Sequence, residues 1–397
     1  MLIGLLGKTN VGKTTFFNAA TMLNAQVADH PFTTIEPNIG VAYARTKCVC
    51  REFNVKDNPR RSLCIDGNRF IAIRMIDVAG LVPDAHKGRG LGNKFLDDAR
   101  QADALIHVVD ASGSTDPEGR PCAIGMNDPL NDIEFVELEF DLWLTSIVSR
   151  DWVKNAKEAE HRGIKFEHLL AKRLSGLSIS EPVIVSVLQE VSKGKGSKYV
   201  QWDDKDIFEF ARALRLRTKP IIIAANKADI STSRENIKRI QATGRLVIPC
   251  MAEAELLLKK ASSKGVIEYI PGDPTFKVKD HALSEEQKRA LEKVRVLMQE
   301  YNGTGVQQTI DVTCFNALNL IVVYPVEDVD RLSDKDGNVL PDAFMLKQGS
   351  TAKDLAMYVH SELAEHFLYA IDARSKQRLG AEYRLKDKDV IKIVSAR

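Results

Sequence analysis

The chain has 397 residues, of which 44% are hydrophobic and 28% are charged, and its formal net charge is +2. This composition is typical of a globular protein, and the length is sufficient for two or three domains. The small net charge creates no global field that would by itself require nucleic acid or an anionic membrane as a partner. No apolar run approaches the roughly 20 residues of a membrane-spanning helix, and the apolar start lacks the basic flank of a signal peptide. We therefore expect a cytoplasmic protein with no membrane partner and no DNA partner.

The first hundred residues read as strand, loop, helix, loop and strand, which is typical of a doubly wound, mostly parallel α/β sheet. Leu2 to Leu6 form a short apolar run, and Thr14 to Leu23 carry apolar residues at helical spacing. Further apolar runs fit central parallel strands, which are buried on both faces. These runs are residues 69–76, 104–109 and 220–225. A fifth strand is expected at 244–249 and a helix at 253–262.

The pattern changes twice in the rest of the chain. Residues 128–215 are rich in Glu, Lys, Leu and Ala, which predicts a helical insertion between two strands. Ser284-Glu285-Glu286-Gln287 is a capping box that opens a helix of about eighteen residues, which ends at Asn302-Gly303. Short strands at 318–324 and 390–394 then flank a helix from Ser350 to about His360, which predicts a small α+β domain.

A glycine-rich segment joins the first strand to the first helix and has the pattern Gly-x-x-x-x-Gly-Lys-Thr. Its position between a buried strand and a helix is the one that a phosphate-binding loop requires, and it argues against a chance glycine turn. Lys13 would bridge the β- and γ-phosphates, the Thr14 hydroxyl would bind Mg²⁺, and backbone N–H groups would surround the phosphates. The residues that we expect to contact the nucleotide here are Gly7, Asn10, Val11, Gly12, Lys13, Thr14 and Thr15.

A second motif, Asp77-Val78-Ala79-Gly80, closes the second apolar strand. At this position an aspartate can hold Mg²⁺ through water, and the N–H group of Gly80 can contact the γ-phosphate. The Asp-x-x-Gly pattern is common by itself. It gains weight because it follows a phosphate loop in the same chain.

A third motif, Asn226-Lys227-Ala228-Asp229, follows the fourth strand directly. Its side chains should emerge at the carboxyl end of the sheet, where ligands bind in open α/β folds. The Asp229 carboxylate can accept hydrogen bonds from both N1–H and the 2-amino group of guanine, and adenine offers no such pair. Asp229 therefore favours GTP, and we expect Asn226, Lys227 and Asp229 together to hold the base. Met251 and Ala252, just past the fifth strand, lie where a backbone amide could meet the guanine O6 atom.

These motifs, together with the stretches 31–40 and 77–83, closely resemble the Obg-like GTPases, in particular their YchF-related branch. The resemblance continues through residues 88–96 and 128–134. It implies that Thr34 binds Mg²⁺ when GTP is present, with Thr33 as the alternative. It also implies a C-terminal TGS domain, a β-grasp (ubiquitin-like) module of about eighty residues, and a role linked to ribosomes or structured RNA.

The expected fold is thus an α/β P-loop GTPase domain with a helical insertion and a C-terminal β-grasp domain. We assign residues 1–127 and 216–278 to the GTPase domain and 128–215 to the insertion. Residues 279–310 form a helical linker, and 311–397 form the TGS-like domain. Catalysis would depend on Lys13, Thr34 and Gly80, and the Mg²⁺ ligands would be Thr14, Thr34 and Asp77. The predicted activity is hydrolysis of GTP to GDP and phosphate.

Several alternatives stay open. YchF proteins characteristically carry Glu at the position of Asp229 and prefer ATP, so an ATPase is the alternative to a GTPase. Leu81 stands where Ras-like enzymes place a water-orienting Gln, which predicts slow intrinsic turnover. Asn10 resembles an asparagine that helps to hold K⁺ in related GTPases, but a role in bracing the loop is equally compatible with a side-chain amide. A scaffold stabilised by nucleotide, with vestigial hydrolysis, is the alternative to a regulatory switch.

A basic stretch and a group of cysteines are two further features of the sequence. A basic stretch at 193–198 precedes four basic residues and has the charge density to meet RNA phosphates, although such runs are more often a solvated face, which we favour. The four residues are Arg212, Arg215, Arg217 and Lys219. Cys48, Cys50 and Cys64 lie within seventeen positions and could reach one metal ion if a fourth ligand came from elsewhere. No such ligand has suitable spacing, so we favour buried thiols.

Overall fold

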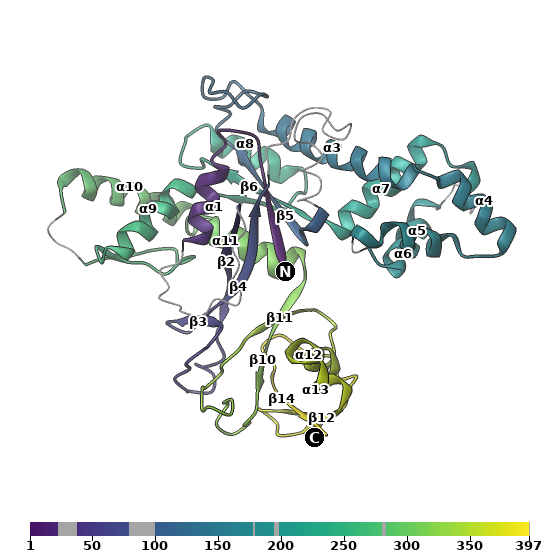
Figure 1. The fold of residues 1–397 in the computed structure, drawn as a ribbon. Coiled ribbons are helices and arrows are strands. Elements are labelled where there is room, and N and C mark those ends of the chain that lie inside the picture. The colour runs from purple at the N-terminus through teal and green to yellow at the C-terminus, as the bar shows by residue number, and fades with distance from the viewer. Residues whose placement is uncertain (23–37, 79–99, 178, 194–197, 280–282, 397) are drawn as a thin grey trace. The chain divides into compact units, whose positions relative to one another are not determined.

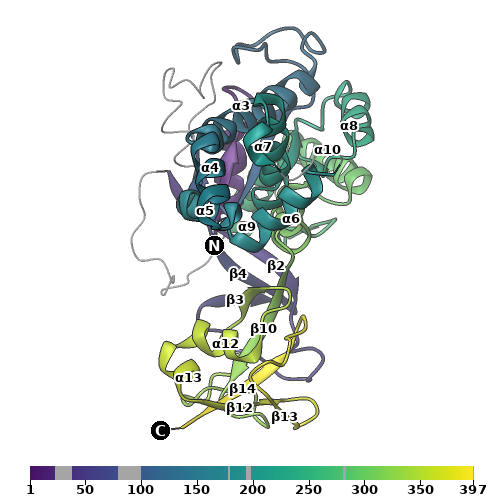
Figure 2. The same cartoon turned by 90° about the vertical axis from the view of Figure 1, so that its right-hand side faces the viewer.

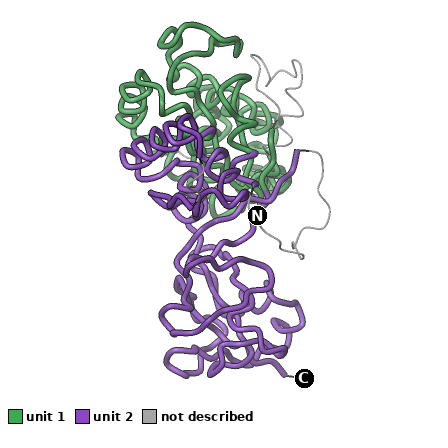
Figure 3. The backbone as a smooth tube through the Cα atoms, turned by 90° about the vertical axis from the view of Figure 1, so that its left-hand side faces the viewer, with its two compact units in different colours: residues 1–17, 75–252 green, residues 18–74, 253–397 purple. Residues whose placement is uncertain are grey.

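The computed structural model describes residues 1–22, 38–78, 100–177, 179–193, 198–279 and 283–396. The chain forms two compact units (Figure 3). One comprises residues 1–17 and 75–252, and the other comprises residues 18–74 and 253–397. Among the described residues, no helix combines the length and the apolar character needed to cross a bilayer.

The largest sheet has seven strands in the order β2-β4-β1-β5-β6-β7, with β3 paired to β4. Figure 1 labels β2, β3, β4, β5 and β6 of this sheet. The strands are β1 (Leu2–Leu6), β2 (Ile39–Lys47), β3 (Ser62–Ile65), β4 (Asn68–Asp77), β5 (Ala104–Asp110), β6 (Ile221–Asn226) and β7 (Val247–Pro249). The pairs β1–β5, β5–β6 and β6–β7 are parallel, whereas β3 and β4 form an antiparallel hairpin. The expected doubly wound, mostly parallel sheet is confirmed, and β5 is buried along its whole length because all but two of its residues are apolar.

A group of helices lies between β5 and β6 in the chain, as the composition of this segment predicts. They are α3 (Pro129–Ser149), α4 (Trp152–Arg162), α5 (Phe166–Leu174), η2 (Ser175–Leu177), α6 (Glu181–Val191), η3 (Tyr199–Gln201) and α7 (Asp204–Thr218). Their shared core is built around Trp152, whose ring stacks on Trp202 with centroids 5.5 Å apart. The Trp152 indole nitrogen donates to the Tyr199 carbonyl oxygen at 2.8 Å. This helical region therefore has an apolar core of its own.

Helix α8 (Ser233–Ala242) connects β6 to β7, and further helices and a two-stranded sheet follow the parallel sheet. They are α9 (Ala252–Ser263), β8 (Ile267–Glu268), β9 (Lys277–Val278), α10 (Glu285–Tyr301), α11 (Val306–Asp311) and the π-helix η4 (Val312–Ala317). The predicted capping box is present: Ser284 Oγ accepts from the Gln287 N–H group, and Gln287 Oε1 accepts from the Ser284 N–H group. Helix α10 ends at Tyr301 and is capped by Asn302, which adopts a left-handed φ of 56°.

The C-terminal sheet has five strands in the order β11-β10-β14-β12-β13, and Figure 2 shows its two helices beside it. Its elements are β10 (Leu320–Val326), β11 (Phe344–Lys347), α12 (Ala352–Val359), α13 (Ser361–Glu365), β12 (Phe367–Asp372), β13 (Arg378–Leu379) and β14 (Val390–Ser395). Strands β10 and β14 are parallel, and the other pairs are antiparallel. The mixed sheet agrees with the expected β-grasp domain. Strand β10 begins two residues later than predicted, because η4 and a turn extend up to it.

Candidate nucleotide-binding site

The phosphate loop between β1 and α1 (Lys13–Thr21) has a backbone that requires its two glycines. Gly7 has a φ of +149°, and a Cβ atom there would lie 2.7 Å from the Val108 carbonyl oxygen. Gly12 has a φ of +87°, and its Cβ atom would lie 2.3 Å from Asn226 Nδ2. Asn10 also has a positive φ, 61°, which asparagine tolerates better than most residues. The glycine pattern of the loop therefore has a steric cause in this fold.

The structure brings Lys13, at the first position of α1, next to Asp77, at the end of β4. Lys13 Nζ lies 2.5 Å from Asp77 Oδ1 and donates to the Val78 carbonyl oxygen at 2.5 Å. Thr14 is exposed and Thr15 is half-buried at the start of the same helix. A hydroxyl and a carboxylate are hard oxygen donors, and these are the ligands that Mg²⁺ prefers. The residues present therefore fit a magnesium ion beside the phosphate loop.

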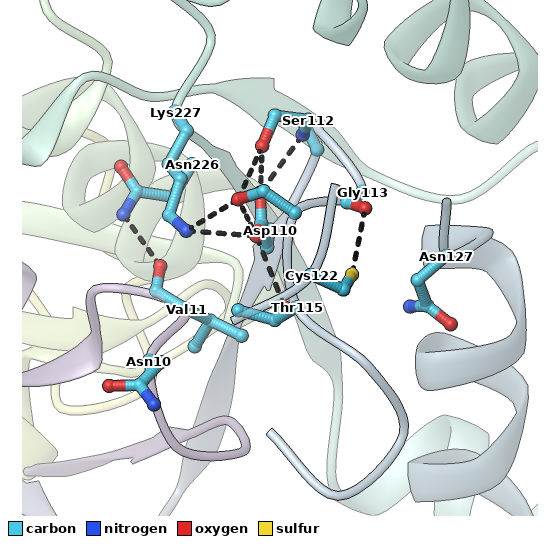
Figure 4. Close-up of polar contacts among 12 residues, drawn as sticks. Asn10, Val11, Asp110, Ser112, Gly113, Thr115, Cys122, Asn127, Asn226 and Lys227 are labelled. Carbon is cyan, nitrogen blue, oxygen red and sulfur yellow. Dashed lines mark hydrogen bonds and ion pairs between the residues drawn. The ribbon is translucent and has the colours of Figure 1, made fainter. Parts of the chain in front are cut away.

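Asn226 joins two parts of the site. Its Nδ2 atom donates to the Val11 carbonyl oxygen at 2.9 Å (Figure 4), and its Oδ1 atom accepts from the Ala252 N–H group at 3.1 Å. The side chain is only 4% exposed. Ala252 is the first residue of α9, so the asparagine also caps a helix N–H group that has no partner within its own helix. Met251 and Ala252 are buried at this junction.

Lys227 turns toward a carboxylate that the sequence did not single out. Lys227 Nζ lies 2.8 Å from Asp110 Oδ2 and 3.1 Å from Ser114 Oγ. Burial raises the pKa of Asp110, but the hydrogen bonds from Lys227, Ser112 and Ser114 outweigh it and hold that pKa below its usual value. The Asp229 side chain, two residues further, is exposed. Asn226 and Lys227 thus build the site, and Asp229 is open to a ligand.

A second loop, between β5 and α3, supports the phosphate loop and was not predicted. Lys8 Nζ donates to the carbonyl oxygens of Thr115 and Asp116 at 3.0 and 2.7 Å, and lies 2.9 Å from Asp132 Oδ1. The hydroxyl of Thr9 donates to the Gly119 carbonyl oxygen at 3.3 Å. Most of the acceptors are backbone atoms more than 100 residues away in the chain, so no side-chain motif marks them. The one available signal was Asp110, which ends a parallel strand at the ligand edge of the sheet.

Asn10 contacts the same supporting loop. Its Nδ2 atom donates to the Gly119 carbonyl oxygen at 2.8 Å. This contact corresponds to the bracing role that we considered for this asparagine. It engages the amide nitrogen, whereas a cation would need the amide oxygen.

Other predicted residues of the nucleotide site lie outside the described residues. They are Thr33, Thr34, Gly80 and Leu81. Most of the basic stretch at 193–198 also lies outside them.

Some of the basic residues that follow this stretch are less exposed to solvent than predicted. Arg215 is buried, and its Nε atom lies 2.5 Å from Asp141 Oδ1. Lys219 is also buried, donates to backbone carbonyl oxygens, and has a pKa that burial lowers. Arg217 is paired with Glu190 at 2.5 Å. The expectation of a solvated face is therefore wrong for Arg215 and Lys219, because both charges are used to hold α7 in place.

The parallel sheet, the glycine loop and the base-reading motif define a P-loop nucleotide-binding protein of the GTPase class. Family models agree over most of the chain. Residues 2–131 match the model described as 50S ribosome-binding GTPase, and residues 224–328 match the model of the Obg-like GTPase YGR210-like, G4 motif-containing domain. Residues 335–395 match the TGS domain.

Full-length relatives support the same conclusion. An uncharacterized GTP-binding protein of Methanocaldococcus jannaschii is 49% identical over 100% of this chain and 99% of its own length. The solved structure of a GTP-binding protein from Pyrococcus horikoshii is 40% identical, covers 100% of both chains and has a TM-score of 0.79. The ribosome-binding ATPase YchF of Bacillus subtilis is 27% identical over 98% of this chain and 97% of its own length.

The chain belongs to the Obg-like, YchF-related family of GTP-binding proteins. This confirms the resemblance that the motifs indicated, the nucleotide-binding domain and the C-terminal TGS domain. P-loop GTPases generally use Mg²⁺, which agrees with the donors at this site.

Proposed function

We propose that this protein hydrolyses GTP to GDP and phosphate and acts as a nucleotide-dependent switch with slow intrinsic turnover. The observation that carries the proposal is the division of work within Asn226-Lys227-Ala228-Asp229. The side chains of Asn226 and Lys227 make a hydrogen bond and an ion pair within the protein, whereas the Asp229 side chain is exposed at the carboxyl end of β6. An exposed carboxylate at this place can accept both hydrogen-bond donors on the edge of guanine. Adenine lacks this pair of donors.

Each residue of the phosphate site has a proposed role. Lys13, which pairs with Asp77 here, would contact the β- and γ-phosphates, and the loop from Gly7 to Gly12 would supply backbone N–H groups. Mg²⁺ held by Thr14, Asp77 and Thr34 would neutralise the phosphate charge. Gly80 would contact the γ-phosphate. Leu81 cannot orient water, and this is the reason for the slow turnover.

An ATP-preferring enzyme is the second candidate. A relative is named as an ATPase, although it is 27% identical to this chain. The two candidate functions differ in the base that the Asp229 side chain would recognise. The choice between them therefore depends on one side chain and can be tested by replacing it.

We further propose a ribosomal or structured-RNA partner and a cytoplasmic location. The support is the description of the matching family model and the name of the Bacillus relative, both of which refer to ribosome binding. We also propose the four-part division of the chain, with the insertion at 128–215 and the TGS-like domain from 311. Helix α3 begins at Pro129 and α7 ends at Thr218, close to the limits of that insertion.

The test is a base-selectivity swap at Asp229. Calorimetry should show that the wild-type protein binds GDP at least about 100-fold more tightly than ADP with Mg²⁺ present. Asp229→Asn should lose GDP affinity and gain affinity for xanthosine diphosphate, because xanthine has an oxygen where guanine has its 2-amino group. Asp204→Asn is a matched control, since Asp204 is also exposed but lies on α7.

The outcomes separate the candidates. Preferential ADP binding by the wild-type protein would replace the GTPase with the ATPase. Selective GDP binding with a turnover that neither ribosomes nor K⁺ changes would favour the nucleotide-stabilised scaffold. Measuring turnover of wild-type protein and Asn10→Ala in K⁺ and in Na⁺ tests the potassium hypothesis, because a bracing role predicts the same loss in both salts.

A further inference from the structure

Four potential metal ligands converge beside the β3–β4 hairpin. Cys48 and Cys50 follow β2, Asp57 lies in the next loop, and Cys64 lies in β3. One ligand atom from each residue lies within 4.8 Å of all the others. Cys48 Sγ is 3.3 Å from Asp57 Oδ2, and Cys50 Sγ is 3.8 Å from Cys64 Sγ. The fourth ligand that the sequence did not reveal is therefore Asp57.

The local backbone explains why these residues meet. The Cys48 N–H group donates to the Gly67 carbonyl oxygen at 2.9 Å, which holds the end of β2 against the hairpin turn. The Val55 N–H group donates to the Cys50 carbonyl oxygen at 2.9 Å, so the segment after Cys50 folds back on itself. This return brings Asp57 to the two thiols.

The spacing matches one tetrahedral ion. Zinc binds cysteine sulfur at about 2.3 Å and carboxylate oxygen at about 2.0–2.2 Å, which places two sulfurs about 3.8 Å apart and sulfur and oxygen about 3.5 Å apart. The observed separations are 3.8 and 3.3 Å. The cluster is too small for a polynuclear metal centre. A disulfide would need a sulfur–sulfur separation of about 2.05 Å.

Burial and charge at the cluster support a cation. Cys48 and Cys50 are each 6% exposed, and the Asp57 side chain is 9% exposed. Arg69, which is fully buried opposite Cys64 in the hairpin, donates from Nη2 to Asp57 Oδ2 at 3.0 Å. Three thiolates and a carboxylate around Zn²⁺ carry a net negative charge, and the guanidinium of Arg69 would offset part of it.

The buried hydroxyl group of Tyr324 is a second observation that points to a ligand at this place. Tyr324 belongs to the same core cluster as Cys48 and is fully buried, yet its hydroxyl has no hydrogen-bond partner among the described residues. Its ring lies 5.4 Å from the Arg69 guanidinium carbon. Buried polar groups without a partner are rare in native proteins and call for an explanation. Hydrogen bonds from neighbouring donors to metal-bound thiolates and carboxylates are a regular feature of metal sites.

We propose that Cys48, Cys50, Asp57 and Cys64 bind one zinc ion. All four positions are filled by protein, so the site is structural and not catalytic. The site also supports the C-terminal domain, because the hydrophobic core that contains Cys48 and Cys50 also contains Val322 and Leu340. In addition, Arg69 donates to the Leu340 carbonyl oxygen at 3.0 Å. Loss of zinc should therefore loosen the packing between the β3–β4 hairpin and β10.

The test is a metal analysis of the full-length protein purified without chelator. Plasma mass spectrometry should find about one zinc ion per chain, and Cys64→Ser and Asp57→Ala should bind much less. Cys314→Ala is the matched control, because Cys314 is a buried cysteine of the same unit that is not among the four potential ligands, and this variant should keep the ion. Hydrogen exchange of β10 should rise in the two zinc-site variants and stay unchanged in the control.

A second measurement covers variants that fail to fold. Co²⁺ added to wild-type protein after zinc removal should give the visible bands of tetrahedral cobalt and the near-ultraviolet charge-transfer bands of three thiolate ligands. Absence of zinc in the wild-type protein, together with no cobalt spectrum, would overturn the proposal. So would full zinc content in Cys64→Ser, or a Cys50–Cys64 disulfide in peptide mapping under non-reducing conditions.

Discussion

Replacing Asn226 by alanine should loosen the phosphate loop and weaken the binding of every nucleotide, whatever its base. The change removes two hydrogen bonds, to the Val11 carbonyl oxygen at 2.9 Å and from the Ala252 N–H group at 3.1 Å. Each bond contributes about 1 kcal/mol net, and a buried group left without a partner costs about 1–3 kcal/mol. We therefore expect a total of about 2–4 kcal/mol, which corresponds to a loss of affinity of about 30- to 700-fold.

Calorimetry with GDP and ADP measures the affinity, and hydrogen exchange of the first turn of α9 measures the freed Ala252 N–H group. Asn236→Ala is a matched control, because Asn236 also donates from Nδ2 to a backbone carbonyl oxygen, that of Ala111 at 2.9 Å, but on α8. The control should keep its nucleotide affinity within about threefold.

The pattern of losses decides whether the reasoning holds. Asn226→Ala should reduce GDP and ADP affinity by similar factors, whereas Asp229→Asn should change the preference between bases. Unchanged GDP affinity in Asn226→Ala, or a loss confined to guanine nucleotides, would refute the proposed link between the phosphate loop and α9.

Three further predictions concern buried charges. Burial raises the pKa of Asp311 from 3.8 to about 7, so the folded state holds a proton that the unfolded state has lost; the free energy of unfolding should fall as pH rises from 3.8 to about 7 and then level off. Urea denaturation across this range should show that dependence in the wild-type protein and not in Asp311→Asn, and equal slopes would contradict it. Glu255→Leu should cost about 3–5 kcal/mol because it leaves the buried Lys259, 3.5 Å away, without its counter-charge and removes the acceptor of the Tyr269 and Thr304 hydroxyls. Adding Lys259→Met should recover the part of this loss that comes from the unpaired charge, and a double variant less stable than the single one would argue against the pair. Lys227→Met should weaken GDP binding about tenfold, since it leaves Asp110 buried without its 2.8 Å ion pair; calorimetry that shows wild-type affinity would exclude this role.

The sequence alone determined the features that depend on neighbouring residues. The glycine loop, the apolar parallel strands and the capping box at Ser284 each follow from short-range sterics or hydrogen bonding, and each appears in the structure. The order of motifs was also enough to identify the family. Strand ends were less well determined, as at β10, where the π-helix η4 ends only three residues before the strand begins.

The tertiary structure decided which distant groups meet. Asp110 forms an ion pair with Lys227, 117 positions away in the chain, and Asp141 forms an ion pair with Arg215, 74 positions away. Neither separation corresponds to a helix or strand repeat, so the sequence alone does not indicate that these charged residues pair. Asp57 is the clearest case: it lies seven positions after Cys50 and seven positions before Cys64, and no metal-binding spacing marks it. A turn and a hairpin bring the three together, because only the folded backbone fixes which side chains share one buried space.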